Sequence, residues 1–372
     1  MSTTNRKTLE PFKEVLKRQK PEVIGEPYNM KVFQNSLPKS AGDPWRGAYS
    51  KHGFWYKFHD GKKEEFDELA VLSIEQDNYM LCYDYYSAWI NVYGEENVKV
   101  LTAKNLKNEV MGGVVAIRKK NYTQIGVYFV KEEFRHSGIG SKLFKEASKG
   151  SVDIVFNAMH HLLPTVAAFG LSECDGRRFL HVKIDCPDGF VRLLKTMDNH
   201  RILATDTASA QEWDSICDFD QKICGEERQL SKLLQLEGSK TVAVFDSEDH
   251  CVGYGTSREL AGKPVKRILV GPLYSTNSTV AETIVRALLQ QYYNPDEDFD
   301  FDPDCYAIYR RSVEFVLPTH ERLMFIIRKL NGNGGKLTKE RMWYKTCSTS
   351  SNVPEVQLDK VYAIGDLHSE LL

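Results

Sequence analysis

One short segment combines residue types and a spacing that can hold an anionic group. Residues 135–141, RHSGIGS, separate a run of valine, tyrosine and phenylalanine from a run with helical periodicity. Because glycine has no Cβ, a bound group can approach the backbone closely at Gly138 and Gly140. The first amides of a helix lack partners inside the helix and carry the positive end of its dipole. The segment therefore predicts a pyrophosphate cradle at a helix N-terminus.

The spacing distinguishes this cradle from two other phosphate-binding loops. A dinucleotide-binding GxGxxG motif has a third glycine, and a P-loop has Gly-Lys followed by Ser or Thr. Neither pattern is present in residues 135–141. What remains is Arg-x-x-Gly-x-Gly between a strand and an amphipathic helix.

The elements that must position this cradle are predicted from the composition of the surrounding chain. Runs rich in valine, isoleucine and tyrosine indicate antiparallel strands, and apolar residues three and four apart indicate helices. The predicted elements are one or two helices within 64–93, strands at 98–103, 110–119 and 122–130, a helix at 138–148, a strand at 152–159, a helix at 163–170 and a strand at 177–184.

A similar order of elements follows in the rest of the chain. It comprises a strand at 200–205, helices at 210–224 and 226–236, strands at 240–246, 251–260 and 265–274, a helix at 278–293 with Ser278 or Thr279 as N-cap, and segments at 305–310, 320–330 and 339–347. The pattern weakens between 185 and 199, where Pro187, Asp188 and Gly189 predict a turn. We therefore expect a flexible N-terminal arm at 1–25, a first domain at 26–188 and a second domain of similar fold at 189–372.

The cradle and its flanks resemble the GCN5-related N-acetyltransferase (GNAT) superfamily. That family has Arg/Gln-x-x-Gly-x-Gly/Ala after its fourth strand, and Val130 and Glu133 also match its common flanking residues. Residues 252–260, 271–274 and 280–289 resemble C-terminal domains of tandem acetyltransferases. The resemblance implies an α+β (mixed α/β) fold with two GNAT-like domains, each a mostly antiparallel twisted sheet with flanking helices.

The resemblance also implies a cosubstrate, acetyl-CoA, and no metal. In the superfamily the fourth and fifth strands splay apart, the pantetheine arm lies in the gap, and an amine attacks the thioester directly. Carried over to this sequence, the backbone near the fourth strand's bulge would hold the pantetheine, and the loop would hold the pyrophosphate. The expected cofactor-binding residues are Phe129, Val130, Arg135, His136, Ser137, Gly138, Ile139, Gly140 and Ser141.

The usual acid and base of the superfamily are absent from the matching positions. Gln124 stands where histone-type members have a glutamate, and Val166 stands where many members have a tyrosine. The candidate substitutes are Tyr128, which we expect to share strand parity with Gln124, and His160, which follows the fifth strand with His161 and Asn157 nearby. Ordinary packing for Tyr128 and a surface or helix-start role for His160 are the alternatives. A water-relayed proton transfer also remains open.

The second half departs further from the family pattern. Ser275, Ser278 and Val280 take the places of Arg135 and the two glycines, and Val280 is expected to push a branched side chain into the approach of the pyrophosphate. We therefore expect a degenerate second domain that covers substrate, forms a dimer or serves only as structure. A non-catalytic ligand- or protein-binding module with the same fold is the rival hypothesis for the whole chain.

The composition limits the kinds of partner that the protein can bind. The chain has 49 Lys+Arg and 51 Asp+Glu, a net charge of −2, which argues against a polybasic nucleic-acid binder. No stretch approaches the roughly 18 apolar residues of a membrane span, and the eight cysteines are scattered without zinc or disulfide spacing. We expect a cytoplasmic protein, with a nuclear location still open, that acts on a small-molecule, peptide or protein amine.

Overall fold

The computed structural model describes most of the chain. The described residues are 42–77, 79–82, 84–185, 191–234, 238–261, 266–292, 311–319, 321–331, 337–338, 343–350, 353–366 and 368. The predicted arm at 1–25 and the predicted segment at 305–310 lie outside them.

The first half has the predicted order of helices and strands. Its elements are β1 (Gly42–Asp43), β2 (Gly47–Tyr49), β3 (Trp55–Gly61), α3 (Lys63–Asp77), α4 (Tyr85–Tyr93), β4 (Val98–Lys104), β5 (Val110–Arg118), β6 (Thr123–Val130), α5 (Ile139–Ala147), β7 (Ile154–Met159), α6 (Leu163–Ala168) and β8 (Ser172–Asp185). The strands β1 to β3 were not predicted.

The second half repeats the series. Its elements are β9 (Arg201–Ala204), α8 (Ala210–Cys224), α9 (Leu230–Leu234), β10 (Lys240–Phe245), β11 (Cys251–Glu259), β12 (Lys266–Ser275), α10 (Ser278–Gln290), β13 (Arg311–Pro318), α11 (Met324–Asn331), β14 (Leu337–Thr338), β15 (Trp343–Ser348) and β16 (Val361–Ala363). The predicted N-cap of α10 is wrong by one residue, because Asn277 caps this helix.

The described strands form one sheet that runs through both halves. Its order is β1-β2-β3-β4-β5-β6-β7-β15-β8-β13-β12-β11-β10-β9, with β14 beside β8 and β16 beside β12. Neighbouring strands are antiparallel except for the pairs β6–β7 and β12–β13. Each half therefore contains one parallel pair inside an otherwise antiparallel sheet, and the mixed α/β fold is confirmed.

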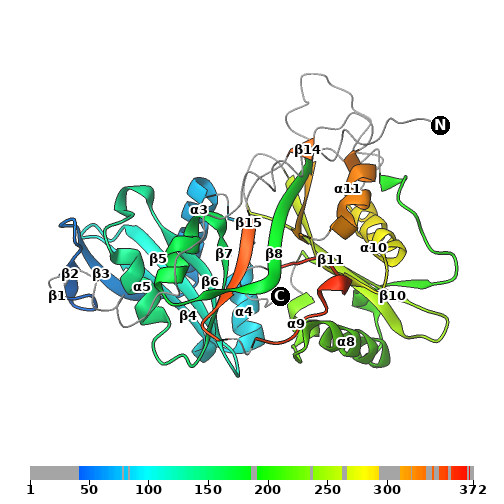
Figure 1. Cartoon of the computed structure of the whole chain (residues 1–372), viewed down its shortest axis with the longest axis horizontal. Coiled ribbons are helices and arrows are strands. Elements are labelled where there is room, and N and C mark those ends of the chain that lie inside the picture. Colours follow the sequence, from blue (N-terminus) through cyan, green and yellow to red (C-terminus); the bar gives the residue numbers. More distant parts are fainter. Residues whose placement is uncertain are drawn as a thin grey trace, which may run out of the picture.

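The two halves exchange strands at the centre of this sheet. β15 comes from the end of the chain but lies between β7 and β8, which both belong to the first half. β8 is long enough to serve both halves, since its first part pairs with β15 and its last part pairs with β13 and β14. In Figure 1 it is the long green strand at the centre, with orange β15 beside it. The predicted boundary at 188–189 therefore divides the sequence into two segments whose sheets complete one another.

The helices cover the two faces of the sheet and build separate apolar layers. Phe66 of α3 and Trp89 of α4 belong to one buried cluster with Val127 and Phe129 of β6. Leu143 of α5 belongs to the cluster on the opposite face. The first cluster also contains residues of α8, α9 and β11, so the halves share a core as well as a sheet.

Candidate functional site

A gap between β6 and β7 is the central feature of the first half. The two strands pair only from Thr123–Ile154 to Ile125–Phe156 and then part. At the same place β6 has a bulge, since Gly126 and Val127 lie between the residues that pair with Val114 and Ala116 of β5. The splay expected for the fourth and fifth strands is therefore present, with its apex at Gly126.

One edge of β6 faces this gap. The carbonyl oxygen of Gly126 accepts a hydrogen bond from the ring of His368 at 2.7 Å. The carbonyl oxygen of Tyr128 accepts one from the hydroxyl of Tyr79 at 2.5 Å, and that of Val130 accepts one from Arg135 at 2.9 Å. Because alternate residues of a strand present their backbone to opposite edges, Val130 faces the gap and Phe129 faces β5. Of the two residues predicted to hold pantetheine through their backbone, the geometry favours Val130.

The loop that follows β6 is tied to neighbouring elements through side chains. Nη2 of Arg135 lies 2.8 Å from both carboxylate oxygens of Asp77, at the end of α3. The hydroxyl of Ser137 donates to the carbonyl of Phe134, and the carbonyl of Ser137 accepts from the backbone of Lys51. The Arg135 and Ser137 side chains therefore support the loop. The backbone amides of the same two residues are also engaged, since they donate to the carbonyls of Glu132 and Phe134 at 3.2 and 3.4 Å.

The two glycines of the motif have different physical roles. Gly138 has φ +88°, in the left-handed region, and a Cβ there would meet nothing within 4 Å. A Cβ on Gly140 would lie 2.5 Å from the hydroxyl of Tyr128 and 3.0 Å from Val130. Gly140 therefore lets α5 pack closely on β6, and its expected contact with a bound anion stays a prediction.

The N-terminus of α5 presents amides toward a possible anion. The first backbone bond of the helix runs from Lys142 to the carbonyl of Gly138 at 3.3 Å. The amides of residues 139–141 consequently have no acceptor inside the helix. Among the described residues, no side chain caps this end of the helix. Ile139 itself is buried, so its expected contact with a cofactor is limited to its amide.

Tyr128 lies in the apolar layer beneath α5. Its ring contacts Phe144, Phe156 and Phe169 with centroid distances of 6.0 to 6.2 Å. Burial raises the pKa of Tyr128 well above its ordinary value. The expected shared parity with Gln124 is wrong, because the bulge shifts the alternation of β6 and puts Tyr128 on the same face as Ile125. Its position argues against the predicted role in proton transfer.

The two histidines after β7 lie at its carboxyl end. They form the turn His160–Leu162, and both side chains are exposed. Partial desolvation lowers the pKa of His161, and the nearby carboxylate of Asp77 opposes this shift. Asn157 is committed to β15, since its Oδ1 accepts from Thr346 at 2.8 Å. A catalytic role for His160 stays a prediction.

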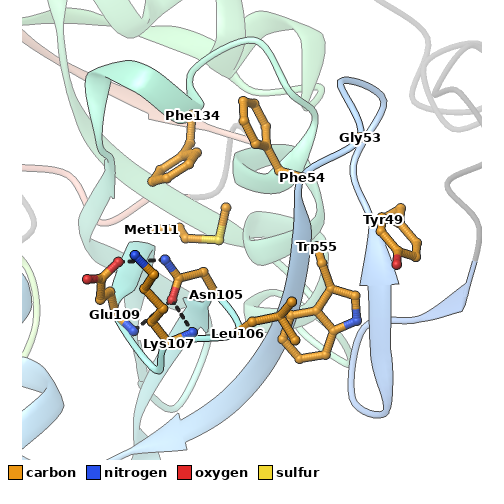
Figure 2. Close-up of a pocket in the computed structure, with 10 residues that line it drawn as sticks. All are labelled: Tyr49, Gly53, Phe54, Trp55, Asn105, Leu106, Lys107, Glu109, Met111 and Phe134. Carbon is orange, nitrogen blue, oxygen red and sulfur yellow. Dashed lines mark hydrogen bonds between the residues drawn. The ribbon is translucent and has the colours of Figure 1, made fainter.

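An apolar pocket of about 420 Å³ adjoins the loop on the side of the β2–β3 hairpin. Figure 2 shows Phe134 of the loop and Phe54 of the hairpin over Met111. The two phenylalanine rings meet edge to face with centroids 5.2 Å apart. The hairpin, which the sequence did not predict, thus helps to hold the loop in place.

The second half has the same splay, but its own chain fills it. β12 and β13 pair from Lys266–Arg311 to Leu269–Glu314 and then part, next to a bulge at Gly271–Pro272. β16 pairs with β12 beyond this bulge, and the amide of Ile364 donates to the carbonyl of Val316 on β13 at 2.9 Å. A Cβ on Gly271 would lie 2.1 Å from the carbonyl oxygen of Ile364. The chain therefore occupies the space that is the gap of the first half.

The second loop is also closed at its helix. Two residues, 276–277, separate β12 from α10, against eight, 131–138, between β6 and α5. Oδ1 of Asn277 accepts hydrogen bonds from the amides of Thr279 and Val280 at 3.0 and 3.1 Å. Val280 packs against Gly253 of β11, so the expectation that it projects into an anion's approach is wrong. The capping side chain, and not a branched residue, occupies the helix N-terminus.

Comparisons with known proteins agree with this architecture. Residues 216–302 match a family model described as an acetyltransferase (GNAT) domain. This segment, which lies in the second half of the chain, is therefore similar to a GNAT domain. The family model matches the second half, whereas the open cradle lies in the first. No curated protein sequence matches the chain significantly.

Solved structures with low sequence identity share the GNAT fold. A Pyrococcus horikoshii protein to which acetyltransferase activity has been ascribed has a TM-score of 0.59 at 15% identity, covering 84% of this chain and 95% of that one. A tandem GNAT protein from the clavulanic acid biosynthesis pathway has a TM-score of 0.57 at 10% identity, covering 79% and 98%. Saccharomyces cerevisiae N-myristoyltransferase with bound myristoyl-CoA has a TM-score of 0.52 at 6% identity, covering 92% and 88%.

Among the described residues, no helix has the length and apolar character to cross a membrane. Within the same residues, no cluster of three or more His, Cys, Asp or Glu side chains is arranged to hold a metal ion.

Proposed function

We propose that this GNAT protein is an acyl-CoA-dependent N-acyltransferase that uses acetyl-CoA and has one cofactor site, in the first half. The observation that carries the proposal is the contrast between two equivalent places in the fold. No side chain of the described residues caps α5 at the place where β6 and β7 part, while Asn277 caps α10 beside a splay filled by residues 361–364. An anionic cofactor with a long arm fits the first place.

In this proposal the protein acts mainly by positioning the cofactor and the amine, and less by supplying reactive side chains. Backbone amides of residues 139–141 hold the pyrophosphate, and the gap-facing edge of β6 from Gly126 to Val130 holds the pantetheine arm. The amine nitrogen attacks the thioester carbonyl carbon, and backbone amides near the bulge stabilise the oxyanion that forms. The acceptor is a primary amine of a small molecule, peptide or protein.

A thiol-release assay with acetyl-CoA and a panel of amines tests this function. The panel holds a polyamine, an amino acid, an aromatic amine and a lysine peptide. Gly138→Asp places a carboxylate in the cradle and should abolish release. Gly150→Asp is the matched control, because Gly150 has φ +80°, also meets nothing within 4 Å and lies just beyond the other end of α5. Asp tolerates the left-handed region better than most residues.

The outcomes separate this function from its rival. A non-catalytic binding module is favoured by Gln124 and Val166, which replace the acid and base common in the superfamily. For such a module, acetyl-CoA would bind while release stayed at background with every amine. Equal release by wild type and Gly138→Asp would contradict the proposed cofactor site.

We also propose a cytoplasmic location. The described cysteines are free, at positions 82, 174, 217, 224, 251 and 347. Free thiols are typical of a reducing compartment.

A further inference from the structure

The end of the chain brings a histidine to the apex of the gap in the first half. His368 follows the segment that fills the splay of the second half, yet its ring binds the bulge of β6. A Cβ on Gly126 would lie 2.7 Å from the carbonyl oxygen of His368 and 3.3 Å from its Cβ. The glycine at the bulge thus permits a close approach of residue 368.

The hydrogen bond to the bulge determines the tautomer of this ring. The partner of Nδ1 is the carbonyl oxygen of Gly126, which can only accept, at 2.7 Å. In the neutral ring Nδ1 therefore carries the proton, and Nε2 carries a free lone pair. Nε2 is buried and has no hydrogen-bond partner among the described residues, in a side chain that is 5% exposed. A buried acceptor without a partner is costly in a folded protein and calls for an explanation.

The first half holds this histidine firmly. The ring stacks on Tyr79 with centroids 5.9 Å apart and an angle of 12° between the planes, and Tyr85 approaches it edge-on at 6.4 Å. The backbone amide of His368 donates to Asp366, whose other carboxylate oxygen accepts from the indole of Trp89 at 2.9 Å. Contacts with α4 and the preceding loop thus fix the ring position relative to β6.

We propose that Nε2 of His368 is the base that removes the proton of the acceptor amine. The proposal rests on the proposed acyl transfer and deepens it. It assigns the base to a residue from the second half of the chain, which also explains why the usual strand residue is replaced by Gln124 in the first half.

The chemical step balances without any other reactant. The lone pair of the amine forms the bond to the thioester carbonyl carbon, and Nε2 takes the proton that the nitrogen loses. The tetrahedral intermediate then collapses, the carbon–sulfur bond breaks, and the thiolate leaves with the bonding electron pair. The imidazolium of His368 returns the proton to this thiolate, so the ring is neutral again after each turnover.

The decisive experiment measures kcat of His368→Ala with two amines of different basicity. With an alkylamine, which is mostly protonated at neutral pH, kcat should fall about 100-fold, within the usual range for loss of a general base. With an aromatic amine, which is unprotonated at neutral pH, kcat should change less than about threefold, since water suffices to remove the proton from its weakly basic adduct. His250→Ala, a substitution at an exposed histidine in the second half, is the control and should match wild type with both amines.

Two further measurements keep the test decisive. Calorimetric titration with acetyl-CoA should give His368→Ala the affinity of wild type within about twofold, because a base contributes to rate and not to ground-state binding. If His368→Ala does not fold, Gly126→Ala serves instead, because its Cβ displaces residue 368 while leaving the imidazole intact. It should reproduce the larger kcat loss with the alkylamine.

The results that would overturn the inference differ from those that would overturn the proposed function. Equal loss of kcat with both amines, or no loss with either, contradicts a base at His368 while leaving acyl transfer in place. Absence of acetyl-CoA binding and of thiol release in wild type contradicts the acyl transfer itself.

Discussion

At the residue scale, Gly138 and Gly140 of the same motif have different structural roles. Gly138 supplies a left-handed backbone conformation at the turn into α5, and Gly140 allows the first turn of α5 to lie against Tyr128 and Val130. The close packing of α5 on β6 is what holds the helix terminus beside the gap. A substitution at Gly140 should therefore act first through stability.

Gly140→Ala should lower the free energy of unfolding by about 1–3 kcal/mol, because the new Cβ lies 2.5 Å from the hydroxyl of Tyr128. Removing that hydroxyl with Tyr128→Phe should recover part of the loss in the double variant. Chemical denaturation of the four proteins in this cycle measures the coupling. If the two substitutions change the free energy of unfolding additively, then Gly140 of α5 and the hydroxyl of Tyr128 are not in contact as described.

The sequence marks the loop of the expected cradle by its local spacing, but it does not mark the distant residues that contact the gap-facing edge of β6. RHSGIGS is local, so its place between strand and helix follows from spacing alone. The position of Tyr128 was predicted wrongly because a bulge, which no local pattern marked, changes the alternation of β6. His368 and Tyr79 reach the gap through tertiary contacts from distant segments, for which one sequence holds no signal.

At the element scale, two equivalent helices differ in their N-terminal caps, and the proposed choice of one half as the anion site rests on this difference. α10 has Asn277 as its cap, whereas the N-cap of α5 is a glycine. The N-termini of α5 and α10 both carry the positive end of a helix dipole and backbone amides without acceptors inside the helix. The two places therefore differ in the capping side chain of Asn277 and in the presence of β16 beside α10's strand, β12.

Asn277→Ala should lower the free energy of unfolding by about 1 kcal/mol, and Asn277→Gly should lower it by only a few tenths. Neither substitution should create a second acetyl-CoA site, because residues 361–364 still fill the splay. Thermal unfolding measures the first expectation, and the stoichiometry of acetyl-CoA in a titration of Asn277→Gly measures the second. A second bound molecule would show that the cap alone closes the site.

A buried ion pair joins the central strands and should shape the acid limit of stability. Glu314 of β13 contacts His181 of β8 at 2.8 Å and Arg267 of β12 at 2.6 Å. Burial alone would raise the pKa of Glu314, but hydrogen bonds from His181 and Arg267 outweigh it and lower this pKa to about 2. A carboxyl whose pKa is depressed by folding stabilises the protein above its unfolded pKa.

The contribution of Glu314 to stability should therefore be complete above about pH 5 and fade as the pH falls toward 2. Glu314→Gln should be less stable than wild type at pH 7 by about 3–5 kcal/mol, since it removes the buried carboxylate that His181 and Arg267 contact. The gap between the two proteins should narrow between pH 5 and pH 2. Urea unfolding across this range measures it, with Glu64→Gln on the exposed face of α3 as control. A constant difference would contradict the assignment.

The order of elements was predictable because strands and helices carry local periodicities. The runs at 110–119 and 240–246 are strands, and 138–148 is a helix within about two residues. The strands β1 and β2 were missed because two or three residues show no clear alternation, whereas β3 has seven residues that alternate in burial and was overlooked. The pairing of β15 with β7 could not be predicted, because strand partners depend on contacts across the whole chain.

At the scale of the whole molecule, the halves are two folds that need one another. β15 completes the sheet of the first half, the end of β8 completes that of the second, and one apolar cluster draws on both. Like β15, the candidate base His368 comes from the end of the chain and lies against a strand of the first half. The tandem arrangement therefore serves the site as well as stability.

Residues 1–188 expressed alone should show no cooperative unfolding transition, because β7 and β8 would lose the strand between them. Co-expression with residues 189–372 should yield a 1:1 complex with the near-native circular dichroism of the intact chain. Size-exclusion chromatography and thermal unfolding measure both. A stable monomer of residues 1–188 that binds acetyl-CoA would contradict the mutual dependence.

The central claim is that one of two equivalent sites binds the cofactor, and calorimetric titration with acetyl-CoA tests it most directly. Wild type and Gly150→Asp should each bind about one acetyl-CoA per chain with the same affinity, and Gly138→Asp should bind none. Saturating acetyl-CoA, at a hundred times its dissociation constant, should then stabilise wild type by about 2.7 kcal/mol. Two molecules bound per chain, or unchanged binding by Gly138→Asp, would contradict the account.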